Sequence, residues 1–241
     1  MSNLILSEVC GLACRITLNR QEKHNCIDIP MLRLLDERLD AANESAAKVI
    51  VICGAGNKAF SSGADLKVFG ALSAAEIPHW IRLGNTVLNR LSTISKPTIA
   101  AVQGYAYGGG LELALACDFR IGTSDAKFSS PELQRGWVPG WGGLSRLRRL
   151  LGEAKAKEVA CFGNVIDGSE AARIGLLTKV VPSEFLEGAL TDIVDRLAAI
   201  DAASFAAAKV VLSASEVGSA EIELQVIATM LARGAQDAAG R

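Results

Sequence analysis

Short, continuous apolar runs separated by helical stretches constrain most strongly what this chain can fold into. The runs are residues 49–53 (VIVIC) and Thr98–Val102 (TIAAV). Continuous apolar character of this kind predicts strands that are buried on both faces of a sheet. Residues 30–43 place apolar side chains on one stripe at helical spacing, and residues 76–91 are a second candidate helix. The front half of the chain therefore predicts a mixed α/β fold.

Further elements follow from the same reasoning. Ala13–Leu18 alternates like a half-buried strand, and Phe119–Thr123 predicts another strand. From residue 144 onward the pattern is helical, so we expect the last third, roughly 144–241, to be all helix. The expected helices are 144–151, 153–162, 168–174, 184–199, 202–213 and 219–234. No low-complexity linker separates the two parts, so we expect them to pack together.

The charge balance argues against several classes of protein. The 241 residues carry 25 basic and 26 acidic side chains, a net charge of −1, which does not fit a general nucleic-acid binder. A local patch of Arg146, Arg148 and Arg149 still suits a phosphate-bearing ligand. We expect no membrane span and no signal peptide, because neither pattern occurs in the sequence. Six cysteines without a CxxC motif predict reduced thiols in a cytoplasmic protein.

Common catalytic and binding motifs are weak or missing. Residues 54–59 (GAGNKA) match the GxGxxA dinucleotide fingerprint, but the residues that follow, FSSG, make a poor helix start. The nucleophile elbow GxSxG is absent, and His24 and His79 are the only histidines, so a Ser–His–Asp site has few candidates. Metal-ligand spacing is also missing, so we expect no metal site.

The most informative motif is the glycine cluster at residues 107–112 (YGGGLE). If a helix begins near Gly109, its free N–H groups point outward and its dipole favours negative charge. This is the physics of an oxyanion hole. Glu112 would then lie in the first turn, close enough to act as an acid or base there. Taken alone, the cluster fits equally a glycine-rich turn in which Glu112 stabilises the helix N-terminus.

Three further segments change that balance: FSSGADLK (60–67), FSSPE (128–132) and GWVPGWGG (136–143). Together with KPTIAAVQGYAYGGGLELALACD (96–118), they make the chain resemble the enoyl-CoA hydratase/isomerase (crotonase) superfamily from residue 19 to about 214. The resemblance implies an α/β fold in which stacked ββα units form a spiral core, residues 1–185. A helical C-terminal region, residues 186–241, would pack on this core and mediate trimer contacts.

The resemblance also implies a binding site for an acyl-CoA thioester. Ala64 and Gly109 match the two residues whose backbone N–H groups hold the thioester oxygen. The substrate and CoA contacts are expected from Ser62, Ala64, Asp65, Leu66, Lys67, Gly109 and Gly140. No separate cofactor or metal is implied, because CoA arrives as part of the substrate. The expected assembly is a homotrimer or a dimer of trimers.

Two glutamates favour hydration among the reactions of this superfamily. Glu112 and Glu132 match the pair of carboxylates that, in hydratases, hold the water added across a 2,3 double bond. Gly140 matches a position whose N–H helps to hold that water. Isomerases typically keep only the second carboxylate, and decarboxylases usually replace one or both. Double-bond isomerisation or decarboxylation of an acyl-CoA stays as an alternative, as does a non-catalytic acyl-CoA-binding subunit.

The chain departs from the hydratase pattern at three places. Trp137 and Trp141 flank the PGxGG turn, where smaller residues are usual, so their rings either narrow the acyl pocket or pack outward. Ser62 stands where alanine is more common. The C-terminal segment ATMLARGAQDAAGR lacks the aromatic and Lys-Arg pattern that covers CoA in relatives, so this covering segment is expected to be shortened or absent.

Overall fold

A six-stranded sheet forms the centre of the computed structural model, which describes residues 3–73 and 75–213. Its strand order is β1-β2-β3-β5-β7-β10; β1 and β2 pair antiparallel, and the other neighbours pair parallel. The strands are β1 (Ile5–Cys10), β2 (Ala13–Leu18), β3 (Val49–Gly54), β5 (Thr98–Val102), β7 (Phe119–Thr123) and β10 (Lys179–Val181). The predicted buried strands β3 and β5 therefore lie side by side in the middle of the sheet.

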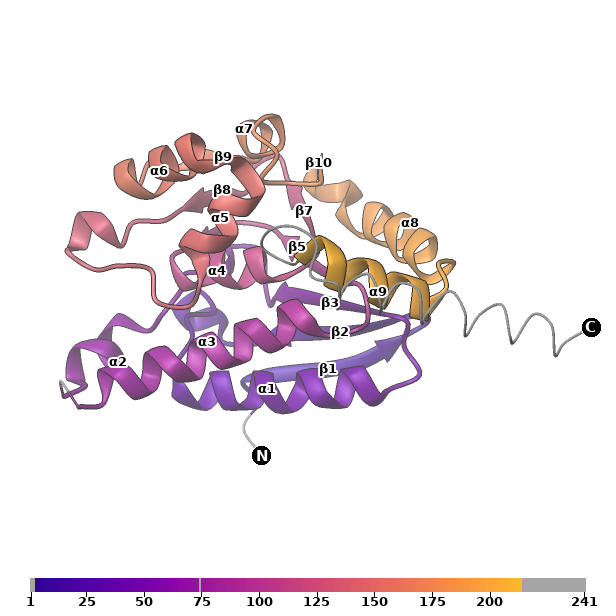
Figure 1. The fold of residues 1–241 in the computed structure, drawn as a ribbon, viewed down its shortest axis with the longest axis horizontal. Coiled ribbons are helices and arrows are strands. Elements are labelled where there is room, and N and C mark those ends of the chain that lie inside the picture. Colours follow the sequence, from indigo (N-terminus) through magenta and orange to yellow (C-terminus); the bar gives the residue numbers. More distant parts are fainter. Residues whose placement is uncertain (1–2, 74, 214–241) are drawn as a thin grey trace, which may run out of the picture.

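A second sheet of four short strands lies beside the first (Figure 1). Its order is β4 (Ala59–Ser61), β6 (Tyr105–Tyr107), β8 (Lys127–Ser129) and β9 (Ile166–Asp167). Each of β3, β5 and β7 is followed by one of these short strands and then by a helix. This repeated order is the spiral of ββα units that the sequence resemblance implied.

The helices connect successive turns of the spiral. They are α1 (Ile29–Glu44), α2 (Leu66–Ala71), α3 (Ile77–Thr93), α4 (Gly109–Ala116), α5 (Gly143–Leu151), α6 (Glu153–Phe162), α7 (Gly168–Arg173), α8 (Leu186–Ala198) and α9 (Ala202–Ser213). The start of α1 shows why its sequence forms a helix there. Asp28 accepts a hydrogen bond from the Met31 N–H at 2.9 Å, and Pro30 occupies the first turn, where a missing N–H costs nothing.

The large sheet is covered on both faces, which explains why its central strands β3 and β5 are apolar at nearly every position. Ile50 and Ile52 face the main core, which α1 and α3 cover. Val49 and Val51 face the opposite way, against buried side chains of α8 such as Leu190. Figure 1 shows α1 and α3 together on one side and α8 on the other. The described part of the predicted C-terminal region therefore packs on the core, although the boundary at residue 186 stays a prediction.

The prediction that the last third is all helix was wrong. Ile166–Asp167 forms β9 against β8, and Lys179–Val181 forms β10 against β7. These strands have two and three residues, too few to show alternation, and pairing with distant strands is what orders them. Strand β4 was likewise not predicted from the sequence. The helix predicted at 219–234 lies outside the described residues. No helix in the described part of the chain is long and apolar enough to cross a membrane.

Candidate active site

The glycine cluster begins a helix, as predicted. Gly108 ends the turn after β6 with φ +51°, a backbone conformation that favours glycine, and α4 starts at Gly109. A side chain at Gly110 would overlap the carbonyl of Ser61 in β4. The glycines therefore allow the first turn of α4 to lie directly on the neighbouring strand. The N–H of Gly109 is one of the first-turn groups that have no partner within a helix.

Ala64 lies next to Gly109, although 45 positions separate them in the sequence. A Cβ atom built on Gly109 would stand 3.3 Å from the Ala64 nitrogen. The segment carrying Ala64 is held by Ile27, whose N–H donates to the Gly63 carbonyl at 2.7 Å and whose carbonyl accepts from the Asp65 N–H at 2.8 Å. These two hydrogen bonds involve Gly63 and Asp65, the residues before and after Ala64. The Ala64 N–H takes part in neither. The two amides predicted to act together are therefore neighbours.

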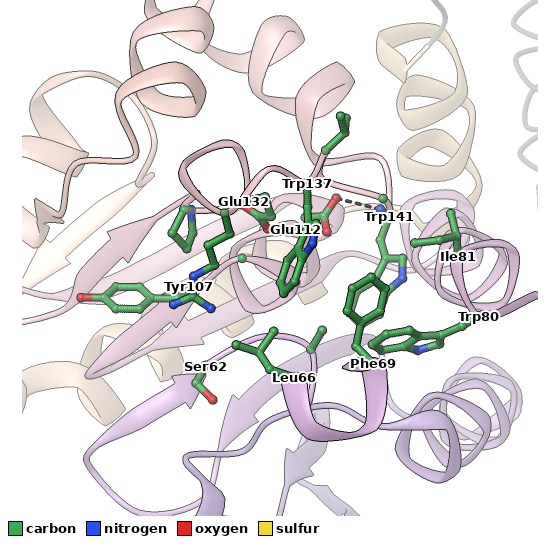
Figure 2. A pocket seen from close by; sticks show the side chains of 17 residues that line it. Ser62, Leu66, Phe69, Trp80, Ile81, Tyr107, Glu112, Glu132, Trp137 and Trp141 are labelled. Carbon is green, nitrogen blue, oxygen red and sulfur yellow. Dashed lines mark hydrogen bonds between the residues drawn. The ribbon is translucent and has the colours of Figure 1, made fainter. Parts of the chain in front are cut away.

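Glu112 lies in the first turn of α4 and is buried. Its Oε1 accepts hydrogen bonds from the Trp141 and Gly143 N–H groups, each at 2.8 Å; Figure 2 shows the bond to Trp141. Burial raises the pKa of the Glu112 carboxyl to about 7. The two N–H groups act in the opposite direction and lower this pKa, while the charge of Glu132 raises it further. Glu112 therefore changes its charge near neutral pH.

Glu132 belongs to a different turn of the spiral, but its side chain lies at the same site as Glu112. Glu132 lies three residues after the end of β8 and directly precedes the short 3₁₀ turn Leu133–Arg135. Its Oε2 accepts a hydrogen bond from the Ser130 hydroxyl at 2.9 Å. A Cβ atom on Gly108 would lie 2.9 Å from its Oε1. The Glu132 carboxylate therefore lies next to Gly108, in the turn before α4. Because α4 carries Glu112, both glutamates belong to one site.

These groups line one cavity of about 130 Å³ (Figure 2). Of the residues predicted for the site, those that line it are Ser62, Ala64, Leu66, Gly109, Glu112, Glu132, Trp137, Gly140 and Trp141. Asp65 and Lys67 are not among its lining residues. Phe69, Trp80 and Tyr107 line it as well, and sequence reasoning did not assign them to the site. Trp80 lies in the predicted helix 76–91, Phe69 lies outside every predicted element, and neither belongs to a catalytic motif.

Asp65 holds the loop rather than lining the cavity. Its Oδ1 accepts from the N–H groups of Lys67 and Val68 and caps α2, while its Oδ2 forms an ion pair with the Arg20 guanidinium at 3.0 Å. Burial tends to raise the pKa of Asp65, but the N–H groups of Val68 and Lys67, with Arg20, outweigh it and leave that pKa below its ordinary value. The charged carboxylate thus fixes the loop immediately after Ala64.

We expect Arg20→Ala to destabilise the fold strongly. Arg20 also pairs with Asp28 at 3.1 Å, so its removal takes the shared cation from two buried carboxylates and leaves only Lys23, 3.8 Å from the Asp65 Oδ2, near one of them. Breaking a buried pair in this way costs about 3–5 kcal/mol. Urea denaturation should show this loss, whereas the matched control Arg15→Ala breaks a largely exposed pair with Glu187 and should cost at most about 1 kcal/mol. Equal effects of the two variants would contradict this account.

The part of the chain that the structure describes contains no group of three His, Cys, Asp or Glu side chains suited to a metal ion. The polar groups of the cavity include backbone N–H groups and two carboxylates, and Ser62, Tyr107 and Arg135 line it as well. Such a set can polarise a carbonyl oxygen and move protons next to it.

Comparison with known proteins agrees with this chemistry. Residues 11–237 match the sequence model of the family described as enoyl-CoA hydratase/isomerase. A crotonyl-CoA hydratase of Syntrophomonas wolfei is 42% identical over 185 residues, which cover 76% of this chain and 71% of that protein. The crystal structure of an enoyl-CoA hydratase from Bacillus anthracis superposes with a TM-score of 0.89 at 32% identity, covering 95% of this chain and 91% of that one.

A Thermobifida fusca structure in complex with acetoacetyl-CoA is also similar, with a TM-score of 0.87 at 31% identity; the match covers 97% of this chain and 95% of that chain. The order of ββα units, the cavity beneath the start of α4 and these matches agree. The chain belongs to the enoyl-CoA hydratase/isomerase family.

Proposed function

We propose that this protein adds water to 2-enoyl-CoA thioesters through the Ala64 and Gly109 amides and the carboxyls of Glu112 and Glu132. The observation that carries this assignment is the meeting of both glutamates and both amides at one cavity. Enoyl-CoA hydration is also the activity of the related crotonyl-CoA hydratase, and this chain is accordingly a hydro-lyase of its family.

In the proposed reaction, the thioester oxygen accepts hydrogen bonds from the Ala64 and Gly109 N–H groups. Withdrawal of electrons toward that oxygen makes C3 of the conjugated double bond electrophilic. Fixed donors stabilise the developing enolate charge without reorganising, an effect of roughly 3–4 kcal/mol per donor in comparable sites. The first turn of α4 adds its positive dipole end at the same place.

Water is added between the two glutamates. Glu112 is the base: its Oε1 is held by two backbone N–H groups, which leaves Oε2 to accept a proton from water as the water oxygen bonds to C3. The Glu132 carboxylate holds the same water by accepting its second hydrogen bond. Glu112 then passes the proton it has taken to C2, so the product gains one water and both carboxyls return to their starting charge. Gly140, which lines the same cavity, is proposed to help hold the water through its N–H.

The pH profile should report the charge of Glu112. Its pKa is raised to about 7, and a base must be ionised to accept a proton. We therefore expect kcat/KM for hydration to fall about tenfold per pH unit below pH 7 and to level off above it. Stopped-flow assays between pH 5 and 8 would measure this limb. A profile that stays flat down to pH 5 would rule out Glu112 as the titrating base.

Product analysis tests the proposed function directly. Purified protein is incubated with crotonyl-CoA and a panel of other acyl-CoA thioesters, and products are separated and weighed by mass spectrometry. We expect a 3-hydroxyacyl-CoA, one water heavier than the substrate. A product of unchanged mass would indicate isomerisation, and loss of carbon dioxide would indicate decarboxylation. Binding without turnover of any thioester would identify a non-catalytic subunit.

The remaining features of the assignment are proposals of the same kind. CoA enters as part of the substrate and no separate cofactor is needed. Leu66, exposed at the cavity edge, and Ser62 are proposed to contact the CoA portion, with Lys67 reaching a phosphate. Assembly as a homotrimer or a dimer of trimers is proposed from the family resemblance, and a cytoplasmic location from the cysteine usage.

A further inference from the structure

Four aromatic side chains form a continuous wall of the cavity. In order they are Trp137, Phe69, Trp80 and Trp141, and we call them the aromatic wall. Ring centroids are 4.8 Å apart for Trp137 and Phe69, 5.1 Å for Phe69 and Trp80, and 5.8 Å for Trp80 and Trp141. Phe69 comes from α2 and Trp80 from α3, while both other tryptophans belong to the loop before α5. Figure 2 shows Phe69, Trp80 and Trp141 gathered on one side of the site.

The exposure of this wall changes from one end to the other. Trp137 is 36% exposed, whereas Trp80 is 1% and Trp141 is 3% exposed. Leu66, also at the edge of the cavity, is 45% exposed. Leu66 and Trp137, with the neighbouring Val138 at 66% exposure, thus mark an end at which solvent and a bulky CoA group can enter. The acyl group must therefore extend toward the closed end, where Trp80 and Trp141 stand.

The indole of Trp141 is wedged between two helices at positions that only glycine allows. A Cβ atom on Gly109, at the start of α4, would lie 2.5 Å from Cζ3 of the indole. A Cβ atom on Gly84, in α3, would overlap its Nε1. On its main-chain side, Trp141 is held by the hydrogen bond from its N–H to Glu112. The close contacts with Gly84 and Gly109 therefore restrict the ring between α3 and α4, and the hydrogen bond to Glu112 fixes the main chain from which it projects.

The cavity that this ring helps to line is small. A cavity of about 130 Å³ is slightly smaller than an engineered cavity of roughly 150 Å³ that holds benzene. Room for about six heavy atoms accommodates the acyl part of a short thioester but not a long chain. The tight packing of the wall gives the cavity little means of expanding, because protein interiors are close-packed.

We infer that the Trp141 indole is the stop that ends the acyl pocket and limits this enzyme to acyl groups of about four to six carbons. This inference rests on the proposed function, since it assigns the acyl group of the substrate to the cavity beside Gly109. Trp141 acts here as a specificity-determining residue, and the wedge between Gly84 and Gly109 holds it in place.

The test is the dependence of kcat/KM on chain length for trans-2-enoyl-CoA substrates of four to ten carbons. Wild-type protein should lose activity by at least about tenfold between the shortest and the longest, since misfit of a methylene group in an apolar pocket costs about tenfold or more. In Trp141→Ala and in Trp141→Leu, the ratio of ten-carbon to four-carbon activity should rise by about tenfold or more. Trp137→Ala, which changes the exposed end of the same wall, should leave that ratio within about twofold of wild type.

The outcomes separate this inference from the proposed function. Equal wild-type activity on four-carbon and ten-carbon substrates would overturn the role of Trp141 without relying on any variant. An unchanged ratio in folded Trp141→Leu protein would do the same. If no thioester were hydrated, the proposed function would fail instead. Calorimetric binding of butyryl-CoA and decanoyl-CoA to wild-type protein would then test the pocket alone, and equal affinities would overturn the inference.

Discussion

Glu112→Gln is expected to lower kcat for hydration of crotonyl-CoA by about 10³-fold, within the range for loss of general acid–base catalysis. The amide oxygen of glutamine can still accept the N–H bonds from Trp141 and Gly143, so the fold and the PGxGG turn stay in place. What disappears is the basic oxygen that takes a proton from water. Steady-state kinetics would measure the loss, with Glu184→Gln as a matched control on an exposed 3₁₀ turn. Unchanged turnover in Glu112→Gln would contradict the assignment of Glu112 as the base.

The same variant should be more stable than wild type at pH 8. The folded protein holds the Glu112 proton with a pKa of about 7, against 4.5 for an ordinary glutamate. The folded state therefore binds this proton more tightly than the unfolded state, and stability is lost as pH rises from about 4.5 to about 7. A difference of about 2.5 pKa units, at about 1.4 kcal/mol per unit, puts the cost above pH 7 on the order of 3 kcal/mol. Denaturation of both proteins at pH 4.5 and pH 8 should show a gain for the variant only at pH 8.

Gly109→Ala is expected to reduce kcat by about 10²–10³-fold, the size of effect seen when an oxyanion donor is lost. The added methyl would lie 2.5 Å from Cζ3 and 2.9 Å from Cε3 of Trp141 and 3.3 Å from the Ala64 nitrogen. Because the indole is wedged against Gly84, the start of α4 has to move instead, and its N–H leaves the position beside Ala64. Kinetics on crotonyl-CoA would show a fall in kcat larger than any rise in KM.

A matched control and a double variant separate this cause from general damage. Gly188→Ala, in α8, has no atom within 4 Å of the added methyl and should leave kcat unchanged. If the clash with Trp141 is responsible, Gly109→Ala combined with Trp141→Ala should recover part of the activity lost in Gly109→Ala alone. Fully additive losses would show that the indole does not transmit the effect.

The most local features of the fold were predictable. The apolar runs at β3 and β5, the stripe of α1 and the helix start at Gly109 follow from spacing within a few residues. The strands β9 and β10 were missed because two or three residues carry no periodicity, and they exist through pairing with β8 and β7. The residues of the candidate site divide in the same way, into those predicted from local spacing and those that were not. Glu112 was placed in the first turn of its helix from its position after the glycines, whereas Glu132 entered only through the resemblance of the FSSPE segment.

The local sequence alone was thus sufficient to place the Glu112 carboxylate beside free N–H groups at the start of α4. Capping, glycine content and helical spacing act within one or two turns of a helix, so they can be read from neighbouring residues. Contacts between distant segments were needed for everything that shapes the cavity. Ala64 stands beside Gly109, Glu132 against Gly108, and Trp141 between Gly84 and Gly109. Each of these pairs depends on how successive turns of the spiral stack, and stacking is set by the packing of side chains that lie far apart in the sequence.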